Sequence, residues 1–80
     1  MNIFRENDVV LLREGVEAKI ITGDDVFIPE GAEGTIVIVH GSADQPSAYE
    51  VEFFIPEKND FALATVDVGL VCKVWLFLWC

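Results

Sequence analysis

Glu50 and Glu52 are the two side chains whose spacing comes closest to a chemical site. They alternate with apolar residues in YEVEFFI, Tyr49 to Ile55, a pattern that predicts a half-buried strand. Residues two apart on a strand share a face and lie about 7 Å apart, a separation at which two carboxylates can support hydrolysis or bind a cation. An outward acidic face is also the ordinary state of a half-solvated sheet. We therefore interpret Glu50 and Glu52 as an acidic face for a partner.

His40 is the only histidine and follows the β-branched run TIVIV. Acid–base or nucleophilic catalysis requires a positioned nucleophile or substrate beside the base. No Ser-His-Asp or Cys-His arrangement is recognisable in the spacing around His40. We expect a surface histidine at a strand end and no catalytic residue in the chain.

Acidic residues and glycines concentrate between residues 23 and 34, where a metal or phosphate site would first be sought. The carboxylates of this stretch lack the regular oxygen-ligand spacing of a calcium loop. The GAEG step, Gly31 to Gly34, is too short for a phosphate loop and contains no lysine. We expect no metal site and no cofactor.

The chain contains two cysteines, Cys72 and Cys80. Two cysteines make neither a disulfide framework nor a metal cluster, and no histidine close in sequence would activate their thiols. The opening MNIFRENDVV lacks the basic segment and long apolar core of a secretory signal. We expect two free thiols in a cytoplasmic protein.

The net charge is strongly negative, because 14 acidic residues stand against five basic ones and give −9. Apolar residues make up 52% of the chain, which favours a compact core inside a negative surface. Phe54, Trp75 and Trp79 could stack on nucleobases, but that binding mode normally includes a basic groove for the phosphates. We expect no nucleic-acid binding.

The chain ends on KVWLFLWC, whose last seven residues are all apolar. A bilayer span needs about 20 apolar residues, so we expect no membrane insertion. Whether strand or helix, this segment exposes more apolar surface than a small barrel can cover. We expect a homo-oligomer whose interface contains Trp75, Leu76, Phe77, Leu78 and Trp79. The alternative, a last core strand that closes the barrel, stays open.

Short apolar runs separated by turn residues indicate an all-β domain that forms a small barrel or a rolled sheet. The clearest run, Thr35 to His40, is expected to form a hairpin with Tyr49 to Ile55 through a loop of about eight residues. In the following segment, alternation places Ala62, Ala64, Val66 and Val68 on one face. The remaining expected strands are Asp8 to Leu12 and 16–21, with a very short strand or arc at 26–28.

The order DVVLLREGVEAKIITGDDVFIPEGAEGTIVIVH, followed by AYEVEFF, resembles small SH3-like barrels of the KOW type. More narrowly, DVVL, GTIV and AYEVEF resemble a family of short bacterial proteins classed as a domain of unknown function and found on mobile gene cassettes, in some genomes beside toxin-like genes. The resemblance covers about Asp8 to Asp67 and implies an SH3-like fold. Gly31 and Gly34 are expected at turn positions of positive φ. The apolar ending departs from the family, whose members usually finish on a polar or charged strand.

Together these observations predict one domain, residues 1–80: a single small SH3-like barrel of about five strands at about 8–68, with an apolar C-terminal strand or short helix at about 69–80. We expect a non-catalytic protein-interaction module that self-associates through its aromatic end and presents Glu50 and Glu52 to a basic protein partner. One alternative is an antitoxin- or immunity-like neutraliser of a basic toxin, which the negative field would steer. A second is a small-ligand binder or enzyme that uses the surface carboxylates.

Overall fold

The chain folds into β-strands, as the sequence predicts, and the computed structural model describes residues 3–74. It contains seven strands and one turn of 3-10 helix: β1 (Val9–Leu12), β2 (Val16–Ile20), β3 (Asp25–Ile28), β4 (Glu33–Gly41), β5 (Pro46–Ile55), β6 (Asp60–Asp67), η1 (Val68–Leu70) and β7 (Val71–Lys73). The expected number of about five strands is too low. Each range expected as strand overlaps one of β1 to β6, and β7 is a further strand beyond η1, within the expected C-terminal extension.

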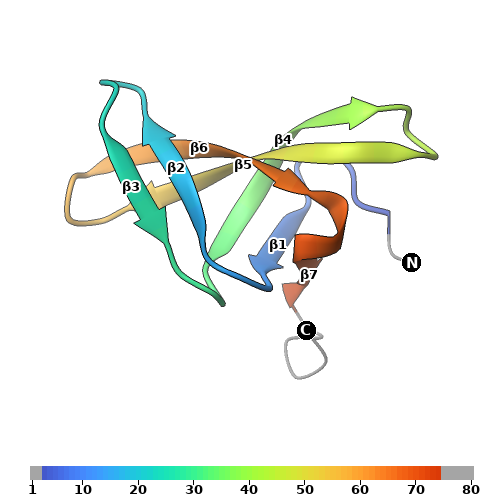
Figure 1. Cartoon of the computed structure of the whole chain (residues 1–80), viewed down its shortest axis with the longest axis horizontal. Coiled ribbons are helices and arrows are strands. Elements are labelled where there is room, and N and C mark those ends of the chain that lie inside the picture. The colour runs from blue at the N-terminus through green and yellow to red at the C-terminus, as the bar shows by residue number, and fades with distance from the viewer. Residues whose placement is uncertain (1–2, 75–80) are drawn as a thin grey trace.

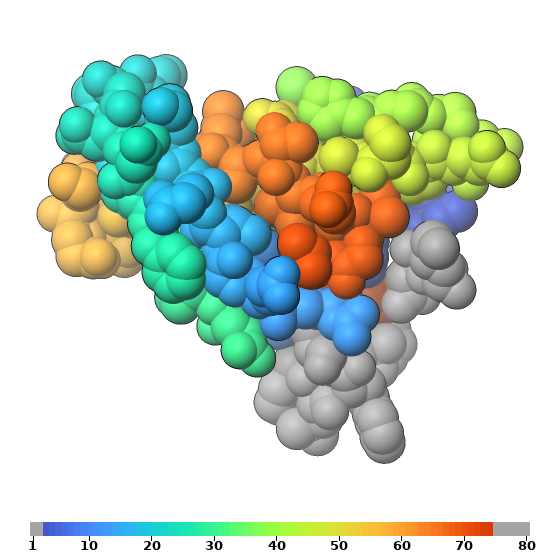
Figure 2. All heavy atoms as spheres, viewed as in Figure 1, coloured from blue at the N-terminus to red at the C-terminus, as the bar shows by residue number. Residues whose placement is uncertain are grey.

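All seven strands belong to one antiparallel sheet in the order β3-β2-β6-β5-β4-β1-β7. The sheet curls into a half-barrel, in which the first strand, β1, pairs with the last, β7 (Figure 1). Figure 2 shows the β4–β5 hairpin, in yellow-green, projecting from one end of the body and the β2–β3 hairpin, in teal, from the other. The curl separates a concave inner face, which holds the core, from a convex outer face.

Side-chain size explains why β5 and β6 pack closely on the inner face. Tyr49, Val51 and Phe53 all point inward and are buried, as their alternation predicts. The register sets Phe53 beside Ala62 and Val51 beside Ala64, so a large residue stands next to a small one. This pairing of sizes fills the interior of a narrow half-barrel without overcrowding it. The other buried apolar residues are Phe4, Val10, Leu12, Ala18, Ile20, Ile28, Ile36, Val66 and Val71.

The β4–β5 hairpin is longer than the sequence predicts, and its loop is shorter. The ladder continues to a pairing of Gly41 with Pro46, so residues 42–45 form the connection in place of the expected loop of eight residues. Gly41 has φ +88°, a left-handed conformation that glycine adopts at little cost. Pro46 is the first residue of β5, where the missing N–H is tolerated.

Gly31 and Gly34 serve different purposes. Gly31 has φ +85° in the turn before β4, as expected. Gly34 lies within β4 and outside the positive-φ region, so that part of the expectation is wrong. A Cβ at Gly34 would lie 2.6 Å from Val51 Cγ1 and 2.7 Å from Phe53 Cε1. Close approach of β4 to the side chains of β5 is therefore the reason for glycine at this position.

Cys72, in β7, is disulfide-bonded, which contradicts the expectation of a free thiol at this position. The other cysteine of the chain, Cys80, lies outside the described residues. Disulfides persist mainly in oxidising environments, so a bonded Cys72 does not support the cytoplasmic location expected from free thiols.

Candidate functional site

The outer face of β5 carries the two glutamates that the sequence singles out. The register pairs Glu50 with Ile38 of β4 on one side and with Thr65 of β6 on the other. Glu52 is paired in the same way with Thr35 and Leu63. Each carboxylate therefore lies between hydroxyl and apolar neighbours.

Glu50 is held by two neighbours through one oxygen. Thr65 Oγ1 donates a hydrogen bond to Glu50 Oε1, and His40 Nε2 lies 3.5 Å from the same oxygen. The sequence does not suggest these contacts, because they depend on strand register. The β5–β6 ladder sets Thr65 beside Glu50, and a register shift between Ile36 and Ile38 sets how β4 aligns with Glu50. In a hydrolytic triad the histidine lies between the carboxylate and the nucleophile. Here the carboxylate lies between histidine and hydroxyl, so the cluster orders Glu50 and does not activate Thr65.

Glu52 differs from Glu50, because among residues 3–74 it has no hydrogen-bond or ion-pair partner. It lines a small hollow of about 180 Å³ on the outer face. The other residues of this hollow are Lys19, Ile21, Asp60, Phe61 and Leu63. The Glu52 carboxylate therefore lies beside three exposed apolar side chains, those of Ile21, Phe61 and Leu63.

Exposed aromatic rings extend this surface toward the β5–β6 turn. Phe54 and Phe61 are directly paired across β5 and β6, and their rings meet edge to face with centroids 5.2 Å apart. They are 50% and 49% exposed, and Ile21, at the tip of the β2–β3 hairpin, is 90% exposed. Ile21, Phe61 and Leu63 were not predicted as site residues. The alternation that buries Ala62 and Ala64 was a usable signal, because it must turn Phe61 and Leu63 outward.

Lys19, the lysine that lines the hollow, forms an ion pair with Asp25 of β3. Lys19 Nζ lies 3.2 Å from Asp25 Oδ1, and both side chains are mostly solvent-exposed. Lys19 is also the direct sheet neighbour of Leu63, which separates it from Glu52 along the row. Its charge is thus directed toward β3, and the side of the hollow formed by Glu52 and Asp60 stays acidic.

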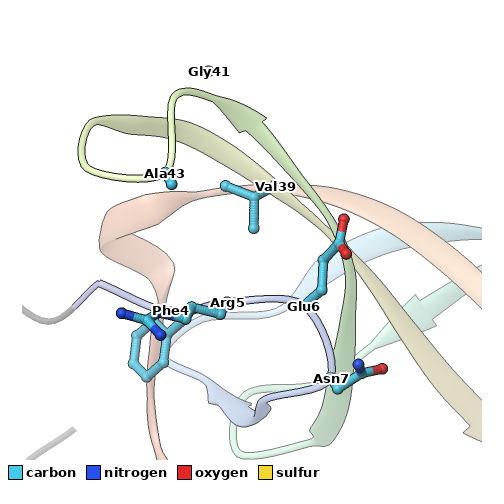
Figure 3. Close-up of a pocket in the computed structure, with 7 residues that line it drawn as sticks. All are labelled: Phe4, Arg5, Glu6, Asn7, Val39, Gly41 and Ala43. Atoms are coloured by element: carbon cyan, nitrogen blue, oxygen red, sulfur yellow. The ribbon is translucent and has the colours of Figure 1, made fainter.

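A larger hollow, of about 440 Å³, lies between the N-terminal segment and the β4–β5 hairpin. Figure 3 shows Val39 pointing from β4 toward the segment that contains Phe4 and Arg5, with Ala43 at the loop above. Its lining combines the polar residues Arg5, Glu6 and Asn7 with the apolar residues Phe4, Val39 and Ala43. These three polar side chains are solvent-exposed.

Two further expectations from the sequence concern the C-terminal interface and metal binding. The residues of the expected C-terminal interface, Trp75, Leu76, Phe77, Leu78 and Trp79, lie outside the described residues. Within residues 3–74, no three His, Cys, Asp or Glu side chains come close enough to hold a metal ion. The same residues contain no helix long and apolar enough to cross a bilayer.

Comparisons with known proteins found no match to this chain. No protein-family model matches the chain, no curated protein matches it in sequence, and no solved structure matches it in fold.

Proposed function

We propose that this chain is a non-catalytic protein-interaction module that presents the outer face of its sheet to a basic protein partner. The observation that carries the proposal is the placement of Glu52 and ordered Glu50 beside exposed Phe54 and Phe61 on one face. Exposed apolar area with carboxylates around it is typical of an interaction surface. The charge of −9 would steer a cationic partner toward this face and speed the encounter.

The composition of the buried core favours a binding function at the surface over catalysis in a cavity. The buried side chains of residues 3–74 are apolar or aromatic, and none is charged. Catalytic groups usually sit in clefts where burial and neighbouring charges tune them. In this fold the charged side chains lie on the surface.

An SH3-like barrel is the more specific fold that we propose. Three features support it: the meander β4–β5–β6, the one-turn helix η1 before the final strand, and the pairing of β7 with β1. Closure of a small barrel would bring together the two edge strands of this sheet, β3 and β7, and the sheet already curls into a half-barrel. The half-barrel curl is consistent with that reading, and the β2–β3 hairpin then extends the barrel beyond β6.

The acidic face can be tested by photo-crosslinking in the native host. A p-benzoylphenylalanine residue placed at Ile38 or at Phe54, both on the outer face, should form an adduct of one defined mass. The same residue at Glu14, which is exposed between β1 and β2, should form none. Replacing Glu50 and Glu52 by lysine should abolish the adduct, because it reverses the charge of the face.

A matched variant controls for net charge. Replacing Glu14 and Glu30 by lysine changes the total charge equally, but at exposed sites away from the outer face, and should leave the adduct in place. Equal crosslinking from all three positions, or equal loss in both lysine variants, would show that the outer face is not a specific binding surface.

A further inference from the structure

We infer that one strip of the outer face binds an arginine side chain carried by an apolar segment of the partner protein. The strip, called here the aromatic–acidic strip, consists of Ile21, Glu52, Phe54, Asp60, Phe61 and Leu63. The inference rests on the proposed function and narrows it, because it names the chemistry of the partner and moves the centre of binding away from Glu50.

The aromatic part of the strip can receive a planar cation. Phe54 and Phe61 meet at an interplanar angle of 62°, so each ring is supported by its neighbour while half of its surface stays exposed. A guanidinium group stacks favourably on such ring faces, where the negative quadrupole attracts it. The aliphatic part of the arginine, and apolar residues beside it in the partner, would cover Ile21 and Leu63.

The acidic part of the strip supplies acceptors next to the rings. Glu52 and Asp60 line the same hollow as Phe61. Asp60 Oδ1 accepts a hydrogen bond from the backbone N–H of Phe61 at 2.8 Å, which fixes the carboxylate and leaves its second oxygen for a ligand. Carboxylates accept from the forked N–H groups of arginine in a way that a single ammonium cannot reproduce.

Charge decides between the possible occupants. A second copy of this chain would bring the same carboxylates face to face under a net charge of −9 on each molecule. A purely apolar segment would cover Glu52 and Asp60 without giving them a partner, and desolvating unpaired carboxylates is costly. A nucleic acid would meet acidic residues at the position where it needs a basic groove. An arginine within an apolar segment satisfies both the rings and the carboxylates.

Fluorescence anisotropy with a short labelled peptide of alternating leucine and arginine tests the inference on the full chain. The Glu52→Gln and Phe61→Ser variants should each weaken binding by about tenfold, the size of effect that a central contact produces. Glu14→Gln removes the same charge away from the strip and should change the affinity by less than about twofold. A peptide with lysine in place of arginine should bind several-fold more weakly, since lysine neither stacks nor forms paired hydrogen bonds.

Ile21→Ser separates binding from folding, because a side chain that is 90% exposed contributes little to the core. This variant should keep the unfolding midpoint of the native chain and still weaken the arginine peptide. Three results would each overturn the inference: no binding of the arginine peptide, equal binding of the lysine peptide, or equal weakening by Glu14→Gln and Glu52→Gln. If outer-face crosslinks form and depend on Glu50 and Glu52, but the arginine peptide does not bind, then this inference fails while the proposed function stands.

Discussion

The backbone N–H of Phe4 donates a hydrogen bond of 3.1 Å to the hydroxyl of Tyr49, across 45 positions in the sequence. Tyr49 is fully buried, and the Phe4 ring meets it edge to face with centroids 6.0 Å apart. The pair attaches the segment before β1 to the middle of β5. The polar tip of the one buried tyrosine thus satisfies a backbone group that this irregular segment would otherwise bury unpaired.

Replacing Tyr49 by phenylalanine should therefore lower the free energy of unfolding by about 1–3 kcal/mol, because the N–H of Phe4 stays buried without an acceptor. Urea denaturation followed by circular dichroism measures the change. The same substitution in a chain that begins at Arg5 should cost much less, since the donor is then missing. An equal cost in both backgrounds would mean that the hydroxyl acts through another group.

Gly34 and Gly69 offer a matched pair of glycine substitutions. Gly34→Ala should destabilise the fold by about 1–3 kcal/mol, because the new methyl group overlaps Val51 and Phe53. Gly69→Ala meets no atom within 4 Å and has no positive φ, so it should be neutral or stabilise by up to about 1 kcal/mol. Urea midpoints of the two variants compare them directly. Equal effects would contradict the close approach of β4 to β5.

The sequence predicts which residues face the core, but it does not predict which residues of adjacent strands lie side by side on the outer face. Alternation alone identifies Tyr49, Val51 and Phe53 as core residues, because a strand turns successive side chains to opposite faces. Alternation says nothing about which residues of the next strand lie alongside. The contacts of Glu50 with His40 and Thr65 depend on the register of both neighbouring strands, and on the β4 side that register includes a shift that no local pattern marks.

Strand ends and strand number were harder still to predict. The ladder between β4 and β5 extends through Gly41 and Pro46, two residues that usually signal the end of a strand. Gly34 was expected in a turn because glycine most often marks one, yet packing against β5 is its reason here. Such features depend on contacts between distant segments, which a single sequence does not display.

The contact between Phe54 and Phe61 should appear as a coupling in a double-mutant cycle. Leucine at both positions removes the edge-to-face contact, and we expect a coupling of about 0.5 kcal/mol, at the lower end of the range because both rings are half exposed. A cycle between Phe27 and Phe61, which share no ring contact, serves as the control and should be additive. Similar coupling in both cycles would attribute the effect to general surface hydrophobicity.

Self-association through the C-terminal segment is the last prediction. Each large aromatic side chain carries roughly 150–250 Å² of surface, so Trp75, Phe77 and Trp79 together could form most of one partner's share of a standard interface. The native chain should therefore sediment as an oligomer at micromolar concentration, and the double variant Trp75→Ser, Trp79→Ser should sediment as a folded monomer. Circular dichroism provides the control for folding. A native monomer would contradict self-association, and an unfolded variant would assign the two tryptophans to the core of the barrel, because only buried side chains destabilise a fold so strongly when they are truncated.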